Sequence, residues 1–241
     1  MQTTGHTALI TGGAAGIGRA LALRFAKAGN QVIAVGRDAQ KLAELKALQP
    51  TISTIQADLA QASERQRLAD QVPAISILIN NAGVQYHGDL VEQQSAHVDR
   101  DQEIAINLTA PIDLIQRFLP KLQQQPEAAI INVSSGLALV PKQQAPIYCA
   151  TKAGIHMFTK ALRWQLEQTQ VRVFEIIPPL VDTAMTAGRG KGKISPEALV
   201  EEFWRGFANN TYQLAIGKVK LLIQLQRFLP ALADRLMRYG R

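Results

Sequence analysis

Tyr148 and Lys152 lie four residues apart in the stretch "APIYCATKAG" (145–154). Four residues make about one turn of an α-helix, so the two side chains would leave the same side of a helix. An ammonium group beside a phenol favours the phenolate and lowers the pKa of the phenol from its ordinary value of about 10. Such a pair could transfer a proton near neutral pH. An ordinary amphipathic helix can carry the same spacing, so the pair has to be judged together with other motifs.

A glycine-rich segment, "TGGAAGIG" (11–18), follows the first apolar run of the chain. Gly12, Gly16 and Gly18 are spaced as Gly-x-x-x-Gly-x-Gly, which is not the Gly-x-Gly-x-x-Gly dinucleotide fingerprint. The physical effect would be similar, because positions without side chains let the backbone and a helix N-terminus approach a pyrophosphate. A tight glycine turn without a ligand is the alternative. The segment lies between a predicted strand and a predicted helix, which favours a nucleotide site.

The second predicted strand ends at Gly36 and Arg37. An NAD site usually carries a carboxylate near this point for the ribose hydroxyls, whereas an arginine accommodates the 2′-phosphate of NADP. Asp38 is the nearest carboxylate, but its charge suits the start of the following helix. Arg37 could also be a solvated surface residue. The sequence favours NADP over NAD as the cofactor.

Small or hydrogen-bonding residues end the next three predicted strands. The third strand ends at Asp58-Leu59 and the fourth at "NNAG" (80–83), and each taken singly is ordinary turn chemistry. The fifth strand ends at Ser134 and Ser135, and the second of these stands thirteen residues before Tyr148. A serine hydroxyl at that place could bind a carbonyl oxygen beside the tyrosine.

The pattern of apolar residues predicts alternating strands and helices. Strands are expected at 6–11, 31–37, 51–60, 75–83, 128–136, 171–179 and 211–217, and helices at 18–30, 39–48, 62–72, 99–119 and 153–168. Nearly continuous apolar strands alternating with helices indicate a parallel sheet covered on both faces. We therefore predict an α/β, Rossmann-like, doubly wound fold in which residues 1–241 form a single domain. Ligands of such sheets bind beyond the carboxyl ends of the strands.

The combined motifs resemble those of the short-chain dehydrogenase/reductase family over roughly residues 5–187. "TGGAAGIG", "NNAG", Asn107 in "INLTAP", Ser135 in "NVSSG" and "YCATK" occur in the order and spacing of that family. The resemblance implies an oxidoreductase that transfers a hydride between a nicotinamide cofactor and an alcohol/carbonyl pair. It implies that Tyr148 is the acid/base and that Lys152 lowers its pKa and holds the nicotinamide ribose. Ser135 would position the substrate carbonyl, and Asn107 would anchor a water molecule of the proton relay.

The same resemblance implies the cofactor contacts. Asp58 and Leu59 would flank the adenine, the segment 81–83 would line the cleft, and Thr183 would bind the nicotinamide carboxamide. The full expected set is Gly12, Gly16, Ile17, Gly18, Arg37, Asp58, Leu59, Asn81, Ala82, Gly83, Tyr148, Lys152, Pro178, Val181 and Thr183. The family usually has Pro-Gly where this chain has Pro178-Pro179, and a second proline fixes φ and removes an N–H group. No metal site is expected, because the four histidines lack ligand spacing.

The C-terminal part, 184–241, is expected to hold a lid loop and a basic amphipathic tail within the domain. The loop "GRGKGK" (188–193) carries three cations, and residues 213–241 carry a net side-chain charge of +5 out of +7 for the chain. Apolar residues at helical spacing between Leu221 and Leu236 predict a helix with a kink near Pro230. This tail could cover the cleft or contact a second subunit, which we favour, or lie on an anionic membrane. "EIIPPLVDT" with this tail is similar to a branch of oxidoreductases named for D-alanine esterification of lipoteichoic acid.

Composition limits the remaining function classes. The single cysteine and the absence of a signal-like N-terminus or a long apolar run predict a cytoplasmic protein. The cations lie in one loop and one tail without aromatic partners, so nucleic-acid binding is not expected. The expected partners are a small carbonyl or alcohol compound, moderately apolar by default, and further copies of the chain in a homodimer or homotetramer. A non-catalytic NAD(P)-sensing protein and a membrane-docked partner of another enzyme are the alternatives.

Overall fold

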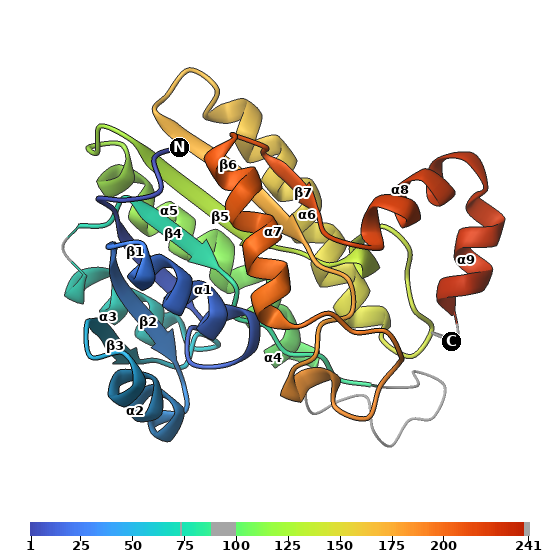
Figure 1. Cartoon of the computed structure of the whole chain (residues 1–241), viewed down its shortest axis with the longest axis horizontal. Helices are drawn as coiled ribbons and strands as arrows, with labels where there is room; N and C mark the ends of the chain where they lie inside the picture. The colour runs from blue at the N-terminus through green and yellow to red at the C-terminus, as the bar shows by residue number, and fades with distance from the viewer. Residues whose placement is uncertain (73, 88–99, 239–241) are drawn as a thin grey trace.

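The computed structural model describes residues 1–72, 74–87 and 100–238 of the chain. Seven parallel strands form one sheet in the order β3-β2-β1-β4-β5-β6-β7. Their bounds are β1 Thr7–Thr11, β2 Gln31–Gly36, β3 Ile52–Gln56, β4 Ile77–Asn80, β5 Ala128–Val133, β6 Val171–Ile177 and β7 Gln213–Ala215. The prediction of a Rossmann-like doubly wound parallel sheet is confirmed (Figure 1).

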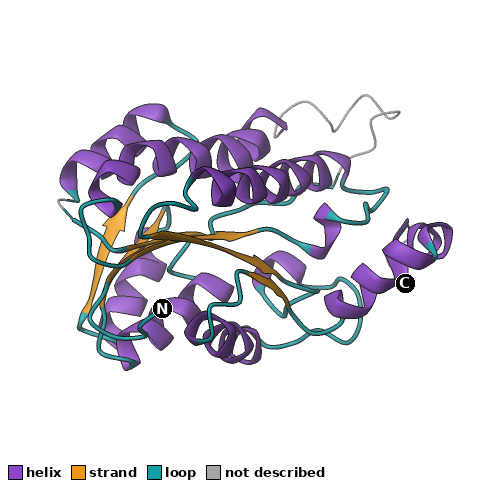
Figure 2. Ribbon diagram, turned by 90° about the horizontal axis from the view of Figure 1, so that it is seen from above, coloured by secondary structure: helices purple, strands orange, loops and turns teal. Residues whose placement is uncertain are grey.

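Helices cover both faces of this sheet (Figure 2). One face carries α1 Gly16–Lys27, α2 Ala39–Leu48 and α7 Pro196–Ala208, and the other carries α3 Ala62–Gln71, α4 Arg100–Ile104, α5 Ala110–Leu122 and α6 Pro146–Gln165. The last two helices, α8 Val219–Phe228 and α9 Pro230–Arg238, stand beside the sheet.

The two faces bury separate apolar cores, because successive side chains of a strand point to opposite faces. In β1, Ile10 packs into the core beneath α1, whereas its neighbour Leu9 packs into the core beneath α5. Both side chains have no exposed surface. The nearly continuous apolar runs of the strands are therefore explained by burial on both sides.

The carboxyl ends of the strands meet at one edge of the sheet. The register pairs Thr11 with Val35, at the ends of β1 and β2, and Asn80 with Asn132, near the ends of β4 and β5. Between β1 and β4 the strand order reverses, and this is the place where doubly wound sheets bind ligands. The segments that follow these strands therefore emerge side by side.

The helix expected over 99–119 contains a local change of winding. Asp99 lies outside the described residues, α4 begins at Arg100, and a π-helical turn at Ala105–Thr109 separates α4 from α5. Single π turns inside helices frequently mark functional sites. This one carries Asn107 at its centre.

Helix α7 was not among the expected elements, although its sequence contains the usual signals. The Ser195 side chain accepts a hydrogen bond from the N–H of Ala198 at 3.1 Å, and Pro196 occupies the first helical turn. The helix packs on α1 through aromatic rings, with the ring of Trp204 4.9 Å from that of Phe25. Burial of these rings explains why the segment is a helix instead of a loop.

The C-terminal tail differs from the expected kinked helix. Helix α8 ends at Phe228 and Pro230 starts α9, so there are two separate helices instead of one kinked helix. They form a hairpin beside the body (Figure 1). Five large apolar side chains of this hairpin are exposed: Leu221, Phe228, Leu229, Leu232 and Leu236. Its far end returns to the body where the N–H of Gln143 donates to the carbonyl of Arg238 at 3.2 Å. None of the described helices has the length and apolarity that crossing a bilayer requires.

Candidate functional site

A cleft of about 330 Å³ lies at the carboxyl ends of the strands, which is within the usual size of ligand pockets. Most of the residues predicted from the sequence line it: Gly12, Gly16, Ile17, Arg37, Asp58, Leu59, Asn81, Ala82, Gly83, Tyr148, Lys152, Pro178 and Thr183. Four predicted residues stand behind this lining. They are Gly18, Asn107, Ser135 and Val181, the last of which forms a bridge to Ile194.

The three glycines after β1 allow close backbone approaches that larger residues would prevent. Gly12 has a left-handed φ of 63°, and a Cβ there would lie 2.9 Å from the Cα of Ala82. A Cβ on Gly18 would lie 2.1 Å from the carbonyl oxygen of Gly12, so this residue keeps the helix against the turn. At Gly16, with a φ of 50°, the same atom would lie 3.0 Å from the Thr183 side chain. The glycines thus hold the start of α1 open to the cleft.

The N-terminus of α1 is suited to a phosphate. Its N-cap residue is Ala15, and no side chain caps the first N–H groups of the helix. Uncapped N–H groups and the helix dipole together favour an anion at such an end. The cradle therefore fits the pyrophosphate of a dinucleotide.

Asn81 joins the end of β4 to the glycine turn. Its Nδ2 donates to the carbonyl of Thr11 at 3.0 Å and to that of Gly12 at 3.3 Å. The Thr11 hydroxyl in turn accepts the backbone N–H groups of Asn81 and Ala82 at 3.0 and 3.1 Å. These bonds explain why an asparagine follows β4, and they fix the floor of the cleft.

The turn after β2 presents two cations to the cleft. Arg37 and Lys41 both line it, and Lys41 was not predicted as a site residue. Asp38 caps α2 by accepting the N–H of Lys41 at 3.1 Å, as expected from the sequence. That hydrogen bond, together with the Lys41 ammonium 3.2 Å from its other oxygen, lowers the pKa of Asp38. Arg37 precedes the N-cap of α2 and Lys41 lies in the first turn of that helix, so helical spacing in the sequence does not pair the two cations.

Tyr148 and Lys152 face the cleft from the first turns of α6, one turn apart. Tyr148 is half-buried, and burial raises its pKa to about 12, although a hydrogen bond with Ser135 lowers it in part. Lys152 is buried, and burial lowers its pKa to about 8. Its Nζ donates to the carbonyl of Val133 at 2.8 Å and lies 5.7 Å from the centre of the Tyr148 ring. Burial of the phenol sets the net direction of the shift, and the expectation that Lys152 lowers the pKa of Tyr148 stays a prediction.

The two remaining catalytic candidates are held by the backbone. The Oγ of Ser135 accepts the N–H of Leu137 at 3.1 Å at the start of a 3₁₀ turn. Asn107 holds Val84 on both sides, since Oδ1 accepts the N–H at 2.9 Å and Nδ2 donates to the carbonyl at 2.8 Å. Its Nδ2 also donates to the Thr151 hydroxyl at 3.2 Å. Its side chain thus fixes the segment that follows β4, close to Gly83 and Lys152.

A buried carboxylate beside the catalytic pair was missed by the sequence reasoning. Glu103 is 2% exposed and accepts the N–H of Tyr86 at 3.2 Å. Its negative charge raises the pKa of Tyr148 and opposes the lowering of the Lys152 pKa. Glu103 stands one turn before Asn107, so the helical spacing could have placed it on the same face.

A second buried carboxylate supports the end of β5. Glu175, 1% exposed, accepts the hydroxyl of Ser134 at 2.5 Å and lies 2.8 Å from Nδ1 of His156. A buried carboxylate is tolerated when hydrogen bonds satisfy it. These contacts connect β5, β6 and α6 directly behind the position of Ser135.

Comparison with known proteins identifies similar chains. A family profile described as "short chain dehydrogenase" matches residues 6–193. The "Uncharacterized oxidoreductase DltE" of Bacillus subtilis (strain 168) is 42% identical over 231 residues, covering 91% of this chain and 91% of the relative. A short chain dehydrogenase from Burkholderia cenocepacia J2315, solved in complex with NADP, is 25% identical with a TM-score of 0.88, over 98% of this chain and 99% of that chain. The bulky-bulky ketone specific alcohol dehydrogenase from Comamonas testosteroni is 28% identical with a TM-score of 0.77, over 94% of each chain.

Proposed function

Because this chain belongs to the short-chain dehydrogenase family, and is thus an oxidoreductase, we propose that it transfers a hydride between NADP(H) and an alcohol/carbonyl pair, with Tyr148 as the acid/base. The observation that carries this proposal is a single cleft that Tyr148, Lys152 and the glycine turn line together. A group able to handle a proton thereby faces the same space as the phosphate cradle.

The protein residues manage the proton and the developing charge. The nicotinamide, when bound, supplies or accepts the hydride. In the reducing direction, Tyr148 gives its proton to the substrate oxygen as negative charge develops there, and a pKa of about 12 keeps the phenol protonated until that step. Ser135, which hydrogen-bonds to Tyr148, would donate to the same oxygen.

Lys152 and Asn107 have supporting roles in this proposal. With a pKa of about 8, Lys152 changes its charge close to neutral pH, so it can pass a proton onward. Asn107 positions the segment after β4 through Val84, and a water molecule on its relay remains a proposal from the family resemblance.

We infer NADP as the preferred cofactor from the two cations at the β2 turn. Arg37 and Lys41 would hold the 2′-phosphate, and Asp38, the carboxylate between them in the sequence, is engaged as the cap of α2. The Burkholderia cenocepacia relative was solved with NADP, which supports the same choice. The glycine turn would hold the pyrophosphate, and Thr183 and Lys152 the nicotinamide half.

Titration with NADPH and NADH at one fixed salt concentration tests this proposal. We expect NADPH to bind at least about tenfold more tightly, and Arg37→Ala to remove most of that difference, since a charge-assisted hydrogen bond is worth about 1.5–3 kcal/mol. Arg172→Ala is the matched control, because Arg172 lies at the opposite, amino end of β6. If NADH binds as tightly as NADPH, the inference of NADP as the preferred cofactor is wrong, whereas the assignment as an oxidoreductase is unaffected.

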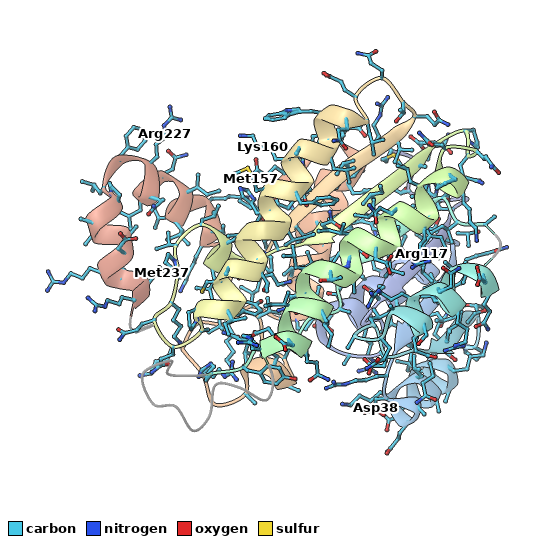
Figure 3. All side chains as sticks on the ribbon, turned by 180° about the vertical axis from the view of Figure 1, so that it is seen from behind. Asp38, Arg117, Met157, Lys160, Arg227 and Met237 are labelled. Carbon is cyan, nitrogen blue, oxygen red and sulfur yellow. The ribbon has the colours of Figure 1, made fainter. Side chains whose placement is uncertain are left out.

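We also propose that the chain works as a homo-oligomer in the cytoplasm. Met157 and Trp164, on the outer face of α6, are 61% and 65% exposed, and Met157 is visible there in Figure 3. Large exposed apolar side chains on one helix face favour burial against a partner. The α8–α9 hairpin offers a further apolar surface, which we assign to a subunit contact in preference to an anionic membrane.

A further inference from the structure

Two cations from separate segments have contacts next to the candidate site. Lys142 precedes α6, and its backbone N–H donates to the sulfur of Cys149, the neighbour of Tyr148. Arg189 belongs to the glycine-rich loop after β6, and its side chain donates to Gln85, two residues after Gly83 of the cleft lining. The pKa values agree with this placement: burial lowers the pKa of His87, and the positive charges of Arg189 and Lys142 lower it further.

The glycine-rich loop holds Arg189 in a defined position. Gly188 and Gly190, on either side, have left-handed φ values of 72° and 58°, and the N–H of Arg189 donates to the carbonyl of Thr186 at 3.0 Å. Its guanidinium Nη1 donates to Oε1 of Gln85, in the segment that follows β4, at 3.0 Å. Arg189 is half-buried, and one of its five N–H donors bonds to a partner within residues 1–72, 74–87 and 100–238.

Lys142 is fixed next to the catalytic tyrosine by its backbone. Its N–H donates to the sulfur of Cys149 at 3.3 Å, and Cys149 is the neighbour of Tyr148. Its carbonyl accepts the N–H of Ala145 at 3.2 Å, which closes the turn that leads into α6. These bonds fix the backbone of Lys142 beside the start of α6.

The carboxylates described near the two cations have other partners. Glu103 is buried behind Tyr148 and accepts from the backbone of Tyr86, and Asp182 lies 3.3 Å from Nζ of Lys193. Within residues 1–72, 74–87 and 100–238, no ion pair joins Arg189 or Lys142 to a carboxylate. An anion bound between them would find charge that is already positioned.

We propose that the carbonyl substrate carries an anionic oxyacid group, a carboxylate or a phosphate, which Arg189 and Lys142 bind while the carbonyl lies at Tyr148. A guanidinium matches either group with two parallel hydrogen bonds, and an ammonium adds a point charge. The inference rests on the proposed oxidoreductase function and replaces the default expectation of an uncharged, moderately apolar substrate. It assigns the glycine-rich loop to substrate selection.

Matched pairs of substrates test the proposal. The pairs are 3-, 4-, 5- and 6-oxo carboxylates against their methyl esters, and dihydroxyacetone phosphate against dihydroxyacetone, each with NADPH and with NADH. We expect kcat/KM for at least one charged member to exceed that of its neutral partner at least about tenfold, the value of one good charge-assisted contact. The oxo acids and the phosphate ester separate the two kinds of anion.

Variants tie this preference to the named residues. Arg189→Gln and Lys142→Gln should each reduce the charged-to-neutral ratio about tenfold. Lys191→Gln is the control, because Lys191 belongs to the same loop, is exposed, and has no hydrogen bond or ion pair with the other described residues. This substitution should leave the ratio unchanged. Calorimetric binding of the preferred anion to the protein with NADP⁺ supplies a readout that needs no turnover, and Arg189→Gln should weaken it by the same factor.

The outcomes separate this inference from the proposed function. Equal kcat/KM for charged and neutral partners, or a preference that neither variant reduces, would overturn the anion site and leave the oxidoreductase intact. Absence of turnover for all pairs with both cofactors, combined with anion binding that depends on Arg189, would instead overturn the proposed reaction. Absence of both turnover and anion binding would overturn the anion site as well.

Discussion

The two ends of the molecule are built on different principles. At the β3–α2 end, near Asp38 in Figure 3, the cofactor cleft is made of backbone held at short distances, with glycines where any side chain would collide. At the other end, near Arg227, the α8–α9 hairpin leaves Leu221 71% and Phe228 68% exposed. The first region would be complete on its own once it binds a cofactor. The second has apolar surface that a soluble monomer rarely exposes in one place.

This difference shows where the functional information of the chain is concentrated. A cofactor of fixed shape requires specific backbone positions, so glycines, Asn81 and the Tyr148–Lys152 spacing are constrained by geometry. A substrate or a partner is selected by side chains that may come from any neighbouring segment. Changes near the cleft should therefore have large and separable effects, and changes in the hairpin should leave the cleft unaffected.

The largest effect is expected at Tyr148. Tyr148→Phe removes the proton that the substrate oxygen receives, and loss of a general acid typically costs about 10²–10⁴ in rate, so we expect about a 10³-fold lower kcat. Stopped-flow or steady-state oxidation of NADPH measures it. NADPH affinity, measured by fluorescence, should stay within about threefold, because the phosphate cradle is untouched. A Phe variant with unchanged kcat would remove Tyr148 from the proton transfer.

The buried ammonium of Lys152 should make the free energy of unfolding of the protein depend on pH. Burial lowers the folded-state pKa to about 8 from 10.5, so between these values the unfolded chain binds more protons and folding stability rises with pH. The gain relative to Lys152→Met is on the order of 3 kcal/mol across that window. Urea unfolding at pH 7.5 and at pH 9.5, about two pH units apart, measures most of this gain in the free energy of unfolding.

A neighbouring lysine provides the control for this measurement. Lys160 lies two turns further along α6 and is exposed, near the ring of Trp164. Lys160→Met should show no such change with pH. If wild type and Lys152→Met keep a constant difference in unfolding free energy, the ammonium of Lys152 is not desolvated and the burial argument is wrong.

Gly18→Ala should act on cofactor binding more than on the rest of the fold. The new Cβ would lie 2.1 Å from the carbonyl of Gly12, so the glycine turn must shift, and overpacking of this kind costs about 1–3 kcal/mol. We expect NADPH to bind about 10–100-fold more weakly. Gly29→Ala, at the other end of α1 and with open space around its Cβ, should strain the backbone without changing NADPH affinity. Equal losses in both variants would indicate general destabilisation.

The sequence supported correct predictions wherever one residue type had one physical explanation. The parallel sheet followed from apolar strands, and the cap of α2 by Asp38 followed from its place before a helix. Predictions were incomplete where the answer depended on which elements approach each other. Lys41 lines the cleft and the buried Glu103 acts on the pKa of Tyr148, and in both cases the meeting of the two elements is a property of the fold.

The pKa of Tyr148 shows the same limit more sharply. The spacing to Lys152 correctly placed both residues on one side of α6, but the direction of the shift depends on how much water the phenol loses. Desolvation is a sum over all surrounding segments, and the charges of Glu103 on α4 and Arg189 on the glycine-rich loop add smaller shifts of opposite sign. Helical spacing therefore predicts which groups meet and leaves their protonation to the packing.

The smallest effect on the cleft is expected from removal of the hairpin. A chain that ends at residue 217 loses α8 and α9, which touch the body mainly near Gly136 and Gln143, away from the glycine turn. NADPH affinity should stay within about twofold, because every contact that shapes the phosphate cradle is retained. Light scattering after size exclusion should show a smaller oligomer, since the exposed apolar side chains of the hairpin would bury against a partner. Flotation with anionic vesicles distinguishes the other role. If the truncated chain keeps both its oligomeric state and its binding to vesicles, the hairpin forms neither a subunit contact nor a membrane contact. If its NADPH affinity falls, the two ends of the molecule are coupled and the contrast between them is wrong.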